Sequence, residues 1–229
     1  MEINHQAILN MLGEMYPQMQ PALNFENPFQ LLVSTILAAQ CTDARVNQVT
    51  PALFRDYPNA FAMAKAEPEE IYPYVKSCGF SAKAKNIVLA SRKIVSDHAG
   101  IVPSGMEDLV ALPGVGRKTA NVVRAFGFGL PAIPVDTHVL RVSNRLGLAC
   151  ALTPEETEKQ LMALIPKENW SDAHHWMLYH GRRVCHSQKP ACAECALKEM
   201  CKAYNTTMIN PKLDARKKRK EAPHDSPAL

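Results

Sequence analysis

The sequence predicts an all-α protein, and three observations favour that class. Alternating polar and apolar runs, which are typical of strands, are scarce, and apolar residues instead recur at every third or fourth position, as at Ile87, Ala90 and Ile94. Alanine and leucine, which favour helices, dominate the composition. Signals for the start of a helix recur along the chain. We therefore expect about ten helices and no sheet.

Four start signals place individual helices. Asn27 is suited to cap a helix, and Pro28 after it is favoured at the first helical position. Glu67–Glu70 carries acids in a first turn, where they stabilise the positive end of the helix dipole. The segments Ser104–Glu107 and Thr153–Glu156 have the spacing of a capping box. Each signal predicts a helix that begins there.

Composition and charge exclude several classes. The 229 residues suit one or two domains, and 47% hydrophobic with 21% charged residues excludes wholesale disorder. The longest apolar run without charge covers residues 27–42, whereas a membrane-spanning helix needs about 20 mostly apolar residues. The first residues lack the basic and apolar regions of a signal peptide. We therefore expect no membrane association.

The net charge of +4 is unevenly distributed. Residues 212–229 hold six bases and three acids, a net +3, which leaves +1 for the rest of the chain. A basic tail of this kind favours nucleic acid as a partner, though only mildly. We expect the tail to be disordered.

The segment Leu112–Ala120 has the pattern of a tight turn between two helices, predicted at 104–111 and 117–128. Gly114 and Gly116 permit positive φ and let another backbone come close. The N–H groups of the turn and of the next helix's first turn lack partners, which suits a phosphate. The pattern indicates either a DNA-backbone contact that reads no sequence or a plain helix–helix corner.

Asp136, in the segment Pro134–His138, fits the N-cap of a helix predicted at 137–148. This structural role does not exclude a chemical one. A capping carboxylate is held rigidly, so it can stabilise positive charge or move a proton.

Four of the seven cysteines fall within 17 residues, in the pattern Cys-x6-Cys-x2-Cys-x5-Cys. Four thiols this close can bind a tetrahedral metal ion or an iron–sulfur cluster. The odd total, without a secretory signal, argues against a disulfide framework and for a reducing compartment. The four are Cys185, Cys192, Cys195 and Cys201.

Together and in this order, the three motifs resemble the endonuclease III family, the bifunctional branch of the helix-hairpin-helix DNA glycosylases. The resemblance covers residues 5–205 and includes Ser34–Asp43. It implies a two-domain all-helical fold, a [4Fe–4S] cluster held by the four cysteines at 185–201, and a location in the bacterial cytoplasm or nucleoid.

The resemblance also implies the domain boundaries. A barrel domain of about six helices would span 22–132 and contain the helix-hairpin-helix motif at 104–128. A second helical domain would join residues 1–21 to 133–211 and hold the cluster.

The implied activity is base-excision repair of duplex DNA that carries oxidised or ring-saturated pyrimidines or abasic sites. The enzyme would flip the nucleotide out, and the Lys118 amine would displace the base and form a Schiff base that allows β-elimination. The amine must be neutral, so its pKa must fall well below about 10.4. The helix dipole contributes too little, so we expect desolvation, helped by Arg117, to lower it. Asp136 would stabilise positive charge developing on the sugar.

Further DNA contacts follow from the resemblance. Gln40 would fill the gap left by the flipped base, or it is a plain polar residue at a helix end. Phe80, in a loop one residue shorter than the family pattern, would act as a wedge, or it is a core aromatic. Lys189 is the one charged residue between Cys185 and Cys192, so phosphate binding by that loop is expected to be weak. The remaining expected contacts are Leu112, Pro113, Gly114, Val115, Gly116, Arg117, Thr119 and His138.

Two alternatives stay open. An adenine-removing mismatch glycosylase shares the hairpin, Asp136 and the cysteines, but it usually lacks the lysine at 118 and has an extra C-terminal domain. A non-catalytic DNA-binding iron–sulfur protein would need neither Lys118 nor Asp136. We expect a monomer, since the motifs require one chain.

Overall fold

A computed structural model describes residues 3–17 and 21–209. Within these ranges the chain forms twelve α-helices and no strand, which confirms the predicted all-α class. The expected number, about ten, was slightly low. The helices are α1 (His5–Met15), α2 (Pro28–Ala38), α3 (Asp43–Asp56), α4 (Ala60–Lys65), α5 (Pro68–Val75), α6 (Ala82–His98), α7 (Met106–Val110), α8 (Arg117–Val122), α9 (Thr137–Leu146), α10 (Pro154–Leu164), α11 (Trp170–Arg183) and α12 (Lys202–Ile209).

Shorter helical segments connect these elements. Four are single 3₁₀ turns, and one is a π-helical segment that continues α8. They are η1 (Lys76–Cys78), η2 (the π segment, Val123–Gly127), η3 (Lys167–Asn169), η4 (Cys192–Glu194) and η5 (Lys198–Met200). The basic tail predicted at 212–229 lies outside the described residues.

Three of the four start signals are confirmed. The Asn27 side chain accepts from an N–H in the first turn of α2, Thr153 does the same for α10, and Glu67 forms a capping box at α5. The prediction for Ser104 is wrong, because the next residue, Gly105, is the N-cap of α7, which begins at Met106.

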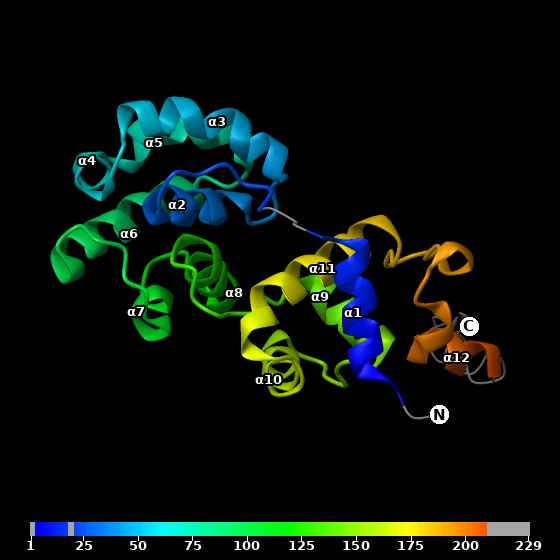
Figure 1. Cartoon of the computed structure of the whole chain (residues 1–229). Coiled ribbons are helices and arrows are strands. Elements are labelled where there is room, and N and C mark those ends of the chain that lie inside the picture. The colour runs from blue at the N-terminus through cyan, green and yellow to red at the C-terminus, as the bar shows by residue number, and fades with distance from the viewer. Residues whose placement is uncertain (1–2, 18–20, 210–229) are drawn as a thin grey trace, which may run out of the picture.

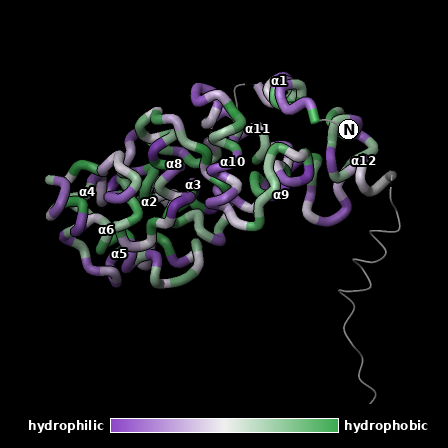
Figure 2. The backbone as a smooth tube through the Cα atoms, turned by 90° about the horizontal axis from the view of Figure 1, so that it is seen from below, coloured by the Kyte–Doolittle hydropathy of each residue, from purple (hydrophilic) through white to green (hydrophobic). Residues whose placement is uncertain are grey.

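The buried apolar residues form two separate clusters. The large core takes its side chains from α2 to α8 and their connections, and the small core takes its side chains from α1, α9, α10, α11 and the cysteine-rich segment. The chain crosses between them twice, after Tyr16 and after Val123. Figure 1 shows α2–α8 grouped on one side of the molecule and α1 with α9–α12 on the other. In the tube of Figure 2 hydrophobic and hydrophilic stretches alternate along the helices, as expected of amphipathic helices around a core.

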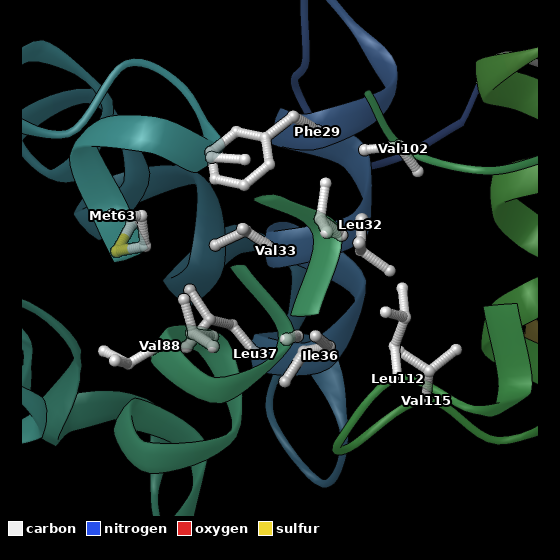
Figure 3. Packing of buried hydrophobic residues seen from close by; sticks show 14 of the residues in the cluster. Phe29, Leu32, Val33, Ile36, Leu37, Met63, Val88, Val102, Leu112 and Val115 are labelled. Atoms are coloured by element: carbon white, nitrogen blue, oxygen red, sulfur yellow. The ribbon is translucent and has the colours of Figure 1, made fainter. Parts of the chain in front are cut away.

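Helix α2 is the centre of the large core. Every residue from Phe29 to Leu37 is buried, and a helix that is buried on all faces is a core element. Figure 3 shows its side chains between those of neighbouring helices and of the turn that carries Leu112 and Val115. The C-terminal end of α2 is therefore a fixed point in the fold.

Helix α1 lies far from its structural neighbours in sequence. It packs on α11, which packs on α9, and all three helices supply buried residues to the small core. Ile8 and Leu12 of α1 are fully buried there. Burial of such side chains stabilises a fold by about 1.5–3 kcal/mol each, which holds the N-terminal segment against the second half of the chain.

Candidate functional site

Lys118 is the second residue of α8, directly after the hairpin turn. Solvent reaches its side chain, yet the surrounding protein displaces enough water to lower the pKa of the amine below its ordinary value. The negative charges of Asp136 and Asp43 oppose this shift, and the positive charge of Arg182 adds to it. The cation that helps is thus Arg182 rather than the expected Arg117.

The hairpin turn before Lys118 uses its two glycines differently. Gly114 has φ +79°, and a Cβ there would lie 2.9 Å from Asn86 of α6. Gly116 has φ −95°, which any residue adopts, and a Cβ there would meet nothing within 4 Å. The positive φ that both glycines permit is therefore adopted at Gly114 and not at Gly116.

Not every expected contact in the turn is free to bind. The side chains of Leu112 and Val115 are buried in the large core, as Figure 3 shows. The N–H of Val115 closes the turn on the Leu112 carbonyl at 3.1 Å. Among the backbone–backbone hydrogen bonds of the described chain, none uses the N–H of Gly114 or Gly116. The exposed glycines, half-buried Pro113 and half-buried Thr119 present the accessible part of the motif.

Asp136 is the N-cap of α9. Its Oδ1 accepts hydrogen bonds from the N–H groups of His138 at 2.8 Å and Val139 at 2.9 Å. One oxygen thus satisfies both amides and fixes the carboxylate at the helix start. The N-cap prediction is right, although α9 ends at Leu146 rather than at 148. His138 is half-buried, with Arg141 Nη2 3.1 Å from its Nδ1.

His174 supports the segment that leads into Asp136. It is buried, and its Nδ1 lies 2.6 Å from the carbonyl oxygen of Pro134. Burial, with the charge of His175 next in importance, lowers the pKa of His174 to about 3. No local pattern predicts this contact, because it joins residues 40 positions apart.

Two ion pairs join the elements around Lys118. Arg117 Nε and Nη2 donate to the two carboxylate oxygens of Glu158 at 2.7 and 2.9 Å. Arg182 of α11 donates to the Asp43 carboxylate, at the start of α3, at 3.1 Å. Both pairs link an element of the large core to one of the small core. Sequence reasoning missed both, since neither leaves a local pattern.

Gln40 and Phe80 are both exposed, and each lies at a position of positive φ or directly after one. Gln40 follows the end of α2 and has φ +56°, a left-handed conformation rare for residues with a side chain. Phe80 is 70% exposed, so the alternative of a core aromatic is wrong. Gly79 before it has φ +108°.

The four cysteines of the spacing motif line a single cavity of about 480 Å³. Its other lining residues include Arg145 and His180. His180 Nε2 lies 3.7 Å from the sulfur of Cys195, and Arg145 Nη1 lies 3.4 Å from that of Cys185. A zinc ion holds its sulfur ligands at about 2.3 Å, and an iron–sulfur cluster held by four thiolates is larger than a single ion. Four thiols that share one cavity suit an iron–sulfur cluster, whose usual protein ligands are four cysteine thiolates.

Arginines of α9 hold the loop that starts at Cys185. Arg145 donates to the carbonyls of His186 and Ser187 at 2.6 and 3.0 Å, and Arg141 donates to that of Cys185 at 3.1 Å. These cations are therefore used internally. Lys189 in the same loop is exposed, with φ +47°.

The helical fold and the hairpin followed by an N-cap aspartate define a class of protein. The chain matches the family model described as HhH-GPD superfamily base excision DNA repair protein over residues 33–167. Among its relatives is endonuclease III of Synechocystis sp., which is 52% identical over 196 residues that cover 85% of this chain and 90% of the relative. Endonuclease III of Bacillus subtilis is 48% identical over 197 residues, with the same shares covered.

A solved structure agrees with these relatives. It is that of a trapped endonuclease III–DNA covalent intermediate, with a TM-score of 0.84 and 42% identity, over 90% of this chain and 100% of the other. The chain belongs to the endonuclease III family, which confirms the resemblance seen in the sequence. Among the described helices, none has the length and apolar character needed to cross a membrane.

Proposed function

We propose that this chain is a base-excision-repair DNA glycosylase that also nicks abasic sites, acting on duplex DNA with oxidised or ring-saturated pyrimidines. One observation carries the proposal: the Lys118 amine has a lowered pKa and lies within the electrostatic influence of the carboxylate of Asp136. A nucleophilic amine beside a rigid carboxylate suits displacement of a base at a sugar carbon.

In the first step the neutral amine of Lys118 attacks C1′ of a flipped nucleotide. The new N–C1′ bond forms as the bond from C1′ to the base breaks, and the base leaves with the electron pair and takes up a proton. The sugar ring then opens to an imine. Loss of a C2′ proton expels the 3′ phosphate, and water finally hydrolyses the imine to free the lysine.

Asp136 has two roles in this scheme. Its charge stabilises the positive charge that develops on the sugar as the base departs, and its free oxygen can accept or return a proton. The two N–H groups of α9 on Oδ1 keep the carboxylate in one orientation. The catalytic assignment of Lys118 and Asp136 is part of the proposal.

DNA contacts follow the accessible residues of the site. The turn at 113–116 and Thr119 would hold the backbone, and Gln40 and Phe80 would enter the base stack from two neighbouring loops. His138 and Lys189 would add contacts at the edge. Leu112 and Val115 would shape the turn from within the core, and Arg117 would first have to leave Glu158.

The four cysteines would hold a [4Fe–4S] cluster, which when bound would tie parts of the loop 185–201 to one another and so contribute folding energy. The cavity that all four cysteines line supports this part of the proposal. We also propose that the two cores correspond to domains at 22–132 and at 1–21 with 133–211, that the chain acts as a monomer, and that it works in the cytoplasm or nucleoid.

Borohydride trapping tests the function. The protein is mixed with a duplex that carries one thymine glycol, borohydride is added, and a covalent protein–DNA band is sought. A band with the wild type that is lost in Lys118→Gln supports the mechanism, because only an imine is reduced to a stable link.

No band despite DNA binding would contradict the mechanism. Release of the free base in that case would point to a monofunctional glycosylase, and lack of release would point to a non-catalytic DNA-binding protein.

A further inference from the structure

Lys83 is a buried lysine whose ammonium makes three hydrogen bonds to backbone carbonyls. It is 7% exposed, although lysine is almost never fully buried. Its Nζ donates to Leu37 at 2.8 Å, to Ala39 at 2.5 Å and to Cys78 at 2.6 Å. An ammonium has three donors, and each is used.

These carbonyls belong to two segments that are far apart in sequence. Leu37 and Ala39 end α2, and Cys78 ends η1. A charge at the end of α2 also suits the negative end of the helix dipole. Lys83 itself lies in the first turn of α6, so one ammonium joins three elements.

Each segment leads at once to a residue proposed to enter DNA. Gln40 directly follows Ala39, and Phe80 follows Cys78 after one glycine. Both junctions are in left-handed backbone conformations, at Gln40 with φ +56° and at Gly79 with φ +108°. Such conformations persist where surrounding contacts hold them.

A second contact joins the same two segments. The thiol of Cys78 is buried, and it interacts with that of Cys41, the residue after Gln40. Burial first, and the neighbouring Cys41 thiol second, raise the pKa of the Cys78 thiol to about 11, so it stays a neutral thiol at neutral pH. The ammonium of Lys83 thus links the backbone just before Gln40 to the backbone just before Phe80.

We propose that Lys83 is a positioning residue that fixes the separation of Gln40 and Phe80, so that both can enter the gap left by one flipped nucleotide. This inference rests on the proposed function, because it presumes that both residues insert. A small misplacement of groups held in a productive geometry is enough to slow a reaction about a hundredfold.

The test compares Lys83→Met, which keeps the length but loses the charge and donors, with Lys83→Gln, which keeps an amide donor. Lys85→Met is the matched control, since Lys85 is exposed two residues along the same helix. Base excision from a thymine-glycol duplex is measured under single turnover. Borohydride trapping on a single-stranded abasic oligonucleotide, which has no base pair to open, is measured beside it.

We expect excision to fall by about tenfold or more in Lys83→Met and by less in Lys83→Gln. Trapping on the single strand should stay within about twofold of wild type, and the control should match wild type in both assays. Hydrogen exchange should rise together in residues 38–42 and 76–81 of Lys83→Gln, a readout that remains if Lys83→Met does not fold.

Equal losses in both assays would overturn the inference, because Lys83 would then support the whole fold. Unchanged excision, or exchange that rises in one segment alone, would overturn it too. Failure of the wild type to trap on any substrate would instead count against the proposed function.

Discussion

Arg117 and Glu158 form a two-fold hydrogen-bonded ion pair that links the hairpin to the small core, one residue before Lys118. The two N–O distances are 2.7 and 2.9 Å, and the Glu158 side chain is 6% exposed. Hydrogen bonding to Glu158 is the first cause that raises the pKa of Arg117. A buried carboxylate paired in this way holds the start of α8 against α10. It therefore fixes the position of the backbone that carries Lys118.

Replacement of Glu158 tests this link. Glu158→Gln removes the charge and one acceptor, and we expect the free energy of unfolding to fall by about 1–3 kcal/mol in urea titrations. Glu155→Gln is the control, because Glu155 is exposed on the same helix and makes no ion pair within 4.0 Å in the described chain. Equal stability of the two variants would show that the pair contributes nothing net.

The two hairpin glycines should separate stability from DNA binding. Gly114→Ala forces a left-handed conformation and a clash with Asn86, so we expect a loss of about 1–3 kcal/mol in unfolding free energy. Gly116→Ala meets open space at an ordinary φ, so its stability should stay within about 0.5 kcal/mol of wild type. Its affinity for duplex DNA should nevertheless fall, because a methyl group would stand where a phosphate approaches. Unchanged affinity in Gly116→Ala would count against a phosphate contact there.

The reaction should gain rate as pH rises through the pKa of Lys118, since the neutral amine is the nucleophile. Because that pKa is lowered from 10.5, the rise should finish below the range of an ordinary lysine. Asp136→Asn keeps a capping side chain but removes the charge that raises the pKa of Lys118. We expect a slower reaction whose pH midpoint lies lower than in wild type, measured as the trapping rate on an abasic duplex. A midpoint that moves to higher pH would contradict this reading of the site.

His174 should make the fold sensitive to acid. Its pKa is lowered from 6.5 to about 3, so below 6.5 the unfolded chain binds a proton that the folded chain does not. Stability from this group is present above 6.5 and is lost as pH falls toward about 3. Denaturant titrations should show that wild type loses more stability than His174→Asn between neutral and acid pH. Parallel losses would mean that His174 is not held neutral by burial.

Only the cysteines of the spacing motif should be needed to bind iron. Cys195→Ser is expected to lower bound iron and acid-labile sulfide and to lower Tm, because a ligand of the cluster is lost. Cys150→Ser is the control, since Cys150 is exposed and lies outside the cavity. Equal iron content in both variants would remove Cys195 from the ligand set.

Much of this protein could be predicted locally. The helical period, the caps at Asn27, Glu67 and Thr153, and the N-cap role of Asp136 depend on residues within one turn of each other. The cysteine spacing and the order of the motifs led to the family, which the relatives confirm. The prediction failed at Ser104, because Gly105, the next residue, is the N-cap of α7.

The amino-acid sequence by itself determined the helical class, the family and the residue types needed for the chemistry. Tertiary structure alone decided their surroundings: Arg117 faces Glu158, His174 faces Pro134, and Lys83 joins the loops of Gln40 and Phe80. Those contacts join residues that are 40 to 46 positions apart and belong to different elements. No local pattern in the sequence encodes them. The physical reason is that burial and pairing depend on what packs nearby, and a periodic sequence specifies which face is buried but not its partner.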